Sequence, residues 1–307
     1  EEGTHWHNYT YYAYNRLNTL FRPRLTYALA CFIEDHGWEA VPNYPAVPER
    51  NPTRMPVAEG KLPADIVTNI RLMAVGAGVG ELGHSKVFLN PKFGPRVRLG
   101  SILTDAELEP DPMIEPGTIC NKCGRCVRDC PGNAIPPVKD ENKKITVEIG
   151  DKKITWGDVH MGRCTLTHHG FNNTISPFHK KAFPNMEFDA ENSDVTEEEA
   201  YRLCYPIATA KWTRTPFDNP NGSIIEYYDY VMNHVGYFAV CGARGCIRAC
   251  MDNLERTKRI ENTFHNKFYR KKSWILPNEK QEKKGRINPW REEWLDKEYP
   301  GIRENEY

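Results

Sequence analysis

Residues 120–131 read Cys120-Asn-Lys-Cys123-Gly-Arg-Cys126-Val-Arg-Asp-Cys130-Pro131. Four cysteines separated by two, two and three residues, and closed by a proline, form the run that binds [4Fe–4S] clusters in bacterial electron carriers. Short turns bring the first three thiolates to a common point, whereas the fourth ligates the other cluster in two-cluster proteins. Zinc or a disulfide framework is the alternative interpretation. The stretch therefore predicts an iron–sulfur protein.

A second cysteine run, Cys241-Gly-Ala-Arg-Gly-Cys246-Ile-Arg-Ala-Cys250, lies nearer the C-terminus. Because the last cysteine of each run serves the other cluster, the first cluster is expected to use Cys120, Cys123, Cys126 and Cys250. The second is expected to use Cys130, Cys241, Cys246 and Cys164, with Cys204 as the alternative to Cys164. Cys31 lies on the apolar face of a predicted helix, where a cysteine is usually a small buried hydrophobe.

Composition and charge limit the class of protein. The 307 residues include 41 Lys+Arg and 41 Asp+Glu, so no net charge favours nucleic acid or a membrane surface. The mean hydropathy of −0.66 indicates a soluble protein, and no apolar run reaches the length of a membrane helix. Nine of the ten cysteines lie between residues 120 and 250, which is typical of metal sites. The opening Glu1-Glu-Gly does not resemble a translation start, so we expect an export signal or an upstream segment to be missing.

The rest of the pattern mixes short helices and strands. We expect helices over residues 24–35, 64–75 and 197–203, strands over 87–89 and 97–104, and a β-hairpin over 144–156 that turns at Gly150-Asp151. A proline-rich extended loop is expected over 41–63.

A glycine loop precedes the cysteine run and reads Gly76-Ala-Gly78-Val-Gly80-Glu81-Leu-Gly83-His84. Gly78, Gly80 and Gly83 match the formal G-x-G-x-x-G pattern. A dinucleotide site needs a strand before this pattern and a helix after it, whereas the preceding residues here have a helical pattern. We therefore favour a loop whose bare backbone approaches something large and flat.

Several motifs, in this order along the chain, resemble the respiratory reductive dehalogenases. They are Gly37-Trp38-Glu-Ala40-Val-Pro42, Gly80-Glu-Leu-Gly-His-Ser85, Asn90-Pro91-Lys-Phe-Gly94-Pro-Arg96, Leu103-Thr104-Asp105 and the first cysteine run. Epoxyqueuosine reductase is a close relative of that family. The resemblance covers residues 14–165 and 241–250.

The resemblance implies an α+β protein in which a nitroreductase-like corrinoid-binding domain is followed by a ferredoxin-like domain with two [4Fe–4S] clusters. The corrinoid and substrate domain would cover residues 1–115 and be incomplete at its N-terminus. The iron–sulfur domain would cover 116–255, with a long insertion near 165–237. Residues 256–307 would form a C-terminal tail. Electrons would pass through both clusters to a base-off corrinoid that removes halide from an organohalide. Consistent with a base-off corrinoid, Asp158-Val-His160-Met-Gly162 is one residue short of the base-on binding motif.

The resemblance also implies site residues. The corrinoid would contact Gly78, Gly80, Glu81, Gly83 and Ser85. Tyr14 would donate the proton, with Tyr12 and Tyr27 as rivals, and Asn43 would be the polar pocket residue, with Asn51 as the alternative. His84 follows Glu-Leu-Gly where the family usually has arginine. A protonated imidazole there would assist the tyrosine or receive the halide; the alternative is a histidine hydrogen-bonded within the loop.

The expected partners are a small halogenated substrate, an upstream electron donor and a small membrane-anchor protein. The family resemblance implies a peripheral position at the outer face of the cytoplasmic membrane, with the cytoplasm as the alternative, and no nucleic-acid partner is expected. Two other functions compete. An epoxyqueuosine-reductase-like enzyme acting on tRNA would need a basic surface, which a neutral chain lacks. A non-catalytic electron carrier leaves the glycine loop unexplained.

Overall fold

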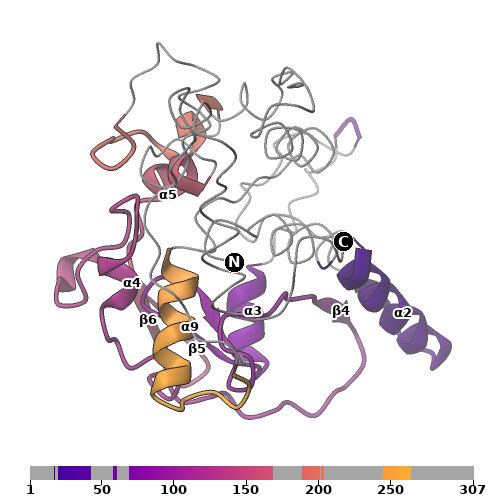
Figure 1. Cartoon of the computed structure of the whole chain (residues 1–307). Helices are drawn as coiled ribbons and strands as arrows, with labels where there is room; N and C mark the ends of the chain where they lie inside the picture. The colour runs from indigo at the N-terminus through magenta and orange to yellow at the C-terminus, as the bar shows by residue number, and fades with distance from the viewer. Residues whose placement is uncertain are drawn as a thin grey trace, which may run out of the picture.

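A computed structural model describes residues 17, 20–42, 58–60, 69–168, 189–200, 202–203 and 245–263. These parts of the chain mix helices and strands, as the sequence predicts (Figure 1). The helices are α2 (Arg22–Asp35), α3 (Ile70–Gly76), α4 (Arg125–Arg128), α5 (Met161–His168) and α9 (Cys246–Arg256). The strands are β1 (Ala40–Pro42), β2 (Glu81–Leu82), β3 (Phe88–Leu89), β4 (Ile102–Thr104), β5 (Lys144–Ile149) and β6 (Lys152–Gly157).

The described strands form three separate antiparallel pairs. β1 pairs with β4, so that Ala40 is opposite Thr104, and β2 pairs with β3. β5 and β6 form the predicted hairpin, whose turn contains Gly150 with a φ of 58°. That left-handed conformation favours glycine, which explains why the hairpin turns there.

Helix α2 confirms the first predicted helix, beginning two residues earlier than expected because Pro23 fits the first helical turn. Its apolar stripe does not face the core. Leu25, Leu29 and Phe32 are 72%, 50% and 58% exposed, while the opposite side packs on the segment before β4, where the Arg22 guanidinium donates to the Leu99 carbonyl at 3.0 Å. The helical period was therefore predictable, but the buried face was not.

Two other predicted elements are shorter in the structure. The described part of the second helix is α3, whose first turn is capped by the Asn69 side chain accepting from the Leu72 amide at 3.2 Å. The strand predicted over 97–104 is reduced to β4, because its partner β1 supplies only three residues for pairing. Residues 197–200 and 202–203 are helical, as expected. Among the described residues, no helix is long and apolar enough to span a membrane.

The core is built around the β2–β3 pair. On one side, Leu82 and Phe88 pack with Val75 of α3 and with Ile154 and Trp156 of β6. On the other side, the fully buried Leu89 packs with Ile119, Leu254 and Ile260, which joins β3 to the start of the cysteine run and to α9. Residues on both sides of the proposed 115/116 boundary thus share one apolar cluster.

The glycine loop lies directly against this core. A Cβ added at Gly80 would overlap the Leu89 carbonyl oxygen and would lie 2.6 Å from the Phe88 ring. At Gly78, where φ is 73°, it would lie 2.6 Å from the Pro112 carbonyl oxygen. The sequence analysis expected the bare backbone of these glycines to approach something large and flat. In the structure, Gly78 and Gly80 instead lie against other parts of the protein.

We expect Gly80→Ala to lower the free energy of unfolding by about 1–3 kcal/mol, because the added methyl group meets backbone atoms that have to shift. Urea unfolding of the anaerobically purified protein would measure the loss. Gly76→Ala is the matched control: it lies in α3, and its Cβ would meet the Ile149 side chain at an ordinary 3.5 Å. The control should be neutral or stabilising by up to about 1 kcal/mol; equal losses in both variants would contradict the close approach at Gly80.

Candidate iron–sulfur site

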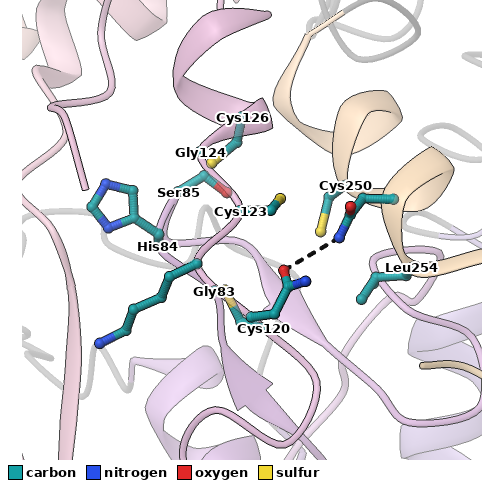
Figure 2. A pocket seen from close by; sticks show the side chains of 12 residues that line it. Gly83, His84, Ser85, Cys120, Cys123, Gly124, Cys126, Cys250 and Leu254 are labelled. Atoms are coloured by element: carbon teal, nitrogen blue, oxygen red, sulfur yellow. Dashed lines mark hydrogen bonds between the residues drawn. The ribbon is translucent and has the colours of Figure 1, made fainter. Parts of the chain in front are cut away.

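Three segments that are far apart in the sequence line one pocket. They are the end of the glycine loop at 83–85, the cysteine run at 120–126 and helix α9 near Cys250. Figure 2 shows the side chains of Cys120, Cys123, Cys126 and Cys250 around the same space. These are the four cysteines that the sequence assigns to the first cluster. The structure brings all four together.

A second group of thiols lies beside the first. Cys130, Cys164 and Cys246 pack with Cys126 around the buried Ala134, Ile135 and Val159. Cys164 comes from α5 and Cys246 from the first turn of α9. The sequence assigned these three to the second cluster. Two cysteines lie outside the described residues: Cys241, the other expected ligand, and Cys204, the alternative to Cys164.

Helix α9 reaches both groups of thiols. Residues four apart on a helix lie on the same face, one turn from each other, and this spacing separates Cys246 from Cys250. The helix is attached to the cysteine run by an ion pair between Arg125 of α4 and Asp252. A second ion pair, between Arg96 and Glu255 at 3.1 Å, attaches its last turn to the segment after β3.

Left-handed backbone turns shape the cysteine run. Lys122 and Gly124 have φ values of 52° and 71°, and Gly124 precedes the single helical turn α4. Two such turns within five residues fold Cys120, Cys123 and Cys126 back toward one space. A non-glycine residue in this conformation is uncommon, which makes Lys122 a strained position next to the thiols.

Burial opposes the ionisation of these thiols. It raises the pKa of Cys126 and of Cys164 to about 11, and it also raises the pKa values of Cys120, Cys246 and Cys250, with the neighbouring thiols adding to the effect. For Cys164, the positive charges of Arg71 and Lys86 act in the opposite direction, but the effect of burial is larger. A bound metal cation reverses this balance and deprotonates coordinating thiols.

Hydrogen-bond donors are directed at the sulfurs. The backbone amides of His84 and Lys122 act on Cys120, and the Val127 amide and Ser85 hydroxyl act on Cys126, in each case lowering the pKa against the larger effect of burial. In the second group, the Ala134 amide donates to the Cys130 sulfur at 3.4 Å. Such donors stabilise thiolate charge and tune metal centres. The His84 amide and the Ser85 hydroxyl thus act on Cys120 and Cys126. The sequence analysis had instead assigned Ser85 to the corrinoid and His84 to the tyrosine or the halide.

No group of three or more His, Cys, Asp or Glu side chains among the described residues converges closely enough to hold a single metal ion. Zinc in a structural site needs such convergence on one point. A cubane cluster presents four separate iron atoms, so its thiolates surround a larger space.

Glu81, the first residue of β2, is 2% exposed and faces the start of the cysteine run. Its carboxylate accepts from the amides of Gly117 at 2.9 Å, Ile119 at 3.1 Å and Cys120. Burial raises the pKa of Glu81, and the backbone amides act in the opposite direction. The sequence analysis assigned Glu81 to the corrinoid and did not indicate that it binds the polypeptide leading into the thiols.

His84 is also buried, and its ring lies outside the ring of sulfurs (Figure 2). Its Nε2 is hydrogen-bonded to the Pro136 carbonyl at 2.8 Å, and its own carbonyl accepts from the Gly157 amide at 2.9 Å. A Cβ on Gly157 would lie 2.9 Å from the imidazole. His84 therefore joins the glycine loop to the hairpin and to the segment after the cysteine run, rather than bonding only within its own loop.

The other predicted catalytic residues are not part of this arrangement. Tyr14 and Asn43, and the alternatives Tyr12 and Asn51, lie outside the described residues. Tyr27 is 67% exposed on α2, and a side-chain hydrogen bond with Cys31 raises its pKa, which is the opposite of what a proton donor near neutrality needs.

Two asparagines were missed by the sequence analysis. Asn121 and Asn253 line the pocket, and the Asn253 amide donates to the Asn121 side-chain oxygen at 3.3 Å, shown as the dashed line in Figure 2. Asn253 is 3% exposed. Its position three residues after Cys250, on the same face of a helix, was the available signal.

The curated relatives of this chain are of two classes of oxidoreductase, reductive dehalogenases and epoxyqueuosine reductases. A tetrachloroethene reductive dehalogenase of Desulfitobacterium hafniense is 43% identical over 70 residues, which is 22% of this chain and 13% of the relative. An epoxyqueuosine reductase of Staphylococcus aureus is 32% identical over 120 residues, which is 38% of this chain and 26% of the relative. The matches confirm the resemblance predicted from the sequence. They also show that the chain matches only a small part of each relative's length.

No protein-family model matches the chain. Among solved structures, a catabolic reductive dehalogenase in complex with 3-bromo-4-hydroxybenzoic acid aligns with 85% of this chain and 31% of its own, with 15% identity and a TM-score of 0.34.

We expect His84→Ala to lower the free energy of unfolding by about 1–3 kcal/mol, because the buried Pro136 carbonyl loses its hydrogen-bond partner. Gly157→Ala alone should also destabilise, because its methyl group meets the imidazole. In the double variant the imidazole is gone, so the combined loss should be smaller than the sum, with a coupling of about 0.5–3 kcal/mol.

Urea unfolding of the four proteins measures this coupling. His36→Ala is the control, since His36 is exposed and bonds only to Phe32 of its own helix, and it should change stability by less than about 0.5 kcal/mol. Strictly additive losses would show that the imidazole does not fill the space beside Gly157.

Proposed function

We propose that this chain is part of a reductive dehalogenase in which two [4Fe–4S] clusters carry electrons to a corrinoid. The observation that supports the proposal most directly is the exchange of cysteines between the two runs. Cys250 lies with Cys120, Cys123 and Cys126, while Cys130 lies with Cys246. This is the pattern that a two-cluster run requires, and it occurs in a chain whose curated relatives include reductive dehalogenases.

The residues present fit two iron–sulfur clusters. In the first site, four thiols line one pocket and receive amide and hydroxyl donors. In the second group, Cys130, Cys164 and Cys246 pack together and the Ala134 amide donates to the Cys130 sulfur at 3.4 Å.

The proposed ligands of the first cluster are Cys120, Cys123, Cys126 and Cys250, and those of the second are Cys130, Cys164, Cys241 and Cys246. When bound, the clusters supply one-electron transfer. The chain's own contribution is to bury the thiols, to hold four of them on helices (Cys126 on α4, Cys164 on α5, Cys246 and Cys250 on α9), and to direct donors at their sulfurs. Cys126 contacts the second group as well as the first, so the two sites adjoin.

The corrinoid is proposed from the resemblance. The described glycines do not form a cradle for it, because Gly78 and Gly80 contact the chain's own backbone. We accordingly assign no residue a step in the halide-removing reaction. The proposal includes a nitroreductase-like domain before a ferredoxin-like domain, divided at residues 115/116. It also includes an organohalide substrate, an upstream electron donor and a membrane-anchor partner at the outer face of the cytoplasmic membrane.

The second candidate is an epoxyqueuosine-reductase-like enzyme. It is favoured by the share of this chain that the match covers, 38% for the Staphylococcus aureus reductase against 22% for the Desulfitobacterium hafniense dehalogenase. The neutral charge of the chain opposes it, because tRNA binding draws on a basic surface.

We expect the anaerobically purified protein to contain about eight iron atoms per chain, and Cys123→Ala to reduce this to about four, because one cubane cluster loses a ligand. Cys164→Ala should also leave about four, whereas Cys204→Ala and the remote Cys31→Ala should retain about eight. Iron and acid-labile sulfide analysis measures these contents. If Cys204→Ala halves the iron content and Cys164→Ala retains all of it, Cys204 rather than Cys164 is the remaining ligand of the second cluster.

The proposed activity is tested by extracting bound corrinoid, recording its visible spectrum and then assaying halide release from a panel of halocarbons with reduced methyl viologen. We expect corrinoid and halide release together. Conversion of epoxyqueuosine in tRNA without halide release would establish the second candidate. Protein with intact clusters but with no corrinoid and neither activity would contradict both candidate enzymes. It would instead support a non-catalytic electron carrier.

A further inference from the structure

The buried carboxylate of Glu81 binds backbone rather than a cation. It is 2% exposed, and its three recorded hydrogen bonds come from the amides of Gly117, Ile119 and Cys120. All three partners are N–H donors, so both oxygens act only as acceptors, which is the pattern of an ionised carboxylate. Successive amides turned toward one point form an anion-binding concavity. Here the anion belongs to the protein itself.

The segment that Glu81 binds is fixed from its other side by Arg259. The guanidinium donates to the carbonyls of Gly117 at 3.3 Å and Thr118 at 3.0 Å. The backbone amides of this segment thus face the Glu81 carboxylate, and its backbone carbonyls face the Arg259 guanidinium. Charge-assisted hydrogen bonds of this kind are about twice as strong as neutral ones, so the backbone leading to Cys120 has little freedom.

Cys120 links this arrangement to the thiols. Its amide is bound by Glu81, while its side chain lines the pocket with Cys123, Cys126 and Cys250 (Figure 2). The position of the first thiol is therefore set by the carboxylate. The same contact places a fixed negative charge beside the thiol, in surroundings that screen charges poorly.

We propose that Glu81 is a positioning residue for the cluster held by Cys120, and that its charge lowers the reduction potential of that cluster. This inference rests on the proposed function, because it requires the cluster to be present. Reduction adds an electron to the site, so a neighbouring negative charge disfavours the reduced form. Removing the charge should make the cluster easier to reduce.

Three variants separate the charge from the position. In Glu81→Gln the side-chain oxygen can still accept from Ile119 and Cys120, so both clusters should be retained and one potential should become more positive. In Glu81→Ala the acceptor is lost, so the iron content should fall by up to half. In Glu81→Asp the charge is kept, so the potential should stay nearer that of the unaltered protein than in Glu81→Gln.

Glu115→Gln is the matched control. Glu115 lies two residues before the same segment, but its side chain is 75% exposed and pairs with Lys152, so water and salt screen its charge. The same Glu→Gln change there should leave both potentials unaltered. The measurements are iron content and redox titrations followed by electron paramagnetic resonance, with Cys164→Ala used to identify the signal of the cluster that contains Cys120.

A positive shift in Glu81→Gln but not in Glu115→Gln, with iron retained, supports the inference. Equal potentials in Glu81→Gln and the unaltered protein overturn the assignment of the charge effect. A Glu81→Ala protein with full iron content and unaltered potentials overturns the positioning role as well. Absence of iron from the unaltered protein would instead overturn the proposed function, and this inference with it.

Discussion

The arrangement of the site depends on the one-turn spacing of two cysteines in helix α9. Cys246 and Cys250 share a helix face, and the two thiols meet different partners: Cys250 lies with the first three cysteines of residues 120–131, and Cys246 lies with Cys130 and Cys164. A helix can hold this separation only if it is itself held in place. Helix α9 is held in place by the Arg125–Asp252 ion pair and by the burial of Leu254 against Leu89. Packing in the core therefore determines which thiols meet.

The glycine loop takes part in the same packing. Gly80 allows β2 and β3 to approach, Glu81 binds the amides before Cys120, and the His84 amide and Ser85 hydroxyl act on cluster thiols. Each residue from the middle of the loop to its end thus has a partner in the protein. A loop whose glycine pattern indicates a large planar cofactor thus supports the thiols through contacts within the protein.

The sequence allowed the parts with strict local rules to be predicted. Cysteine spacing predicted that Cys250 lies with the first three cysteines of the run and that Cys130 lies with Cys246. Alternation with a Gly-Asp turn predicted the β5–β6 hairpin. It did not predict which face of α2 is buried, because helical period fixes a stripe but not its partner. Nor did it predict the partners of Glu81 and His84, which lie 36 to 73 residues away along the chain. Contacts of that range depend on the completed fold.

The balance of charge at the thiols explains why this loop is built as it is. Buried thiols resist ionisation, and a buried carboxylate beside Cys120 adds to that resistance. At Cys120 and Cys126 the opposing groups are backbone amides and one hydroxyl, which are neutral and fixed in place. Fixed dipoles stabilise charge without reorganising. In the proposed enzyme the Glu81 carboxylate would lower the potential of a cluster at these thiols and the amide and hydroxyl donors would raise it, so the potential would depend on the balance of the two.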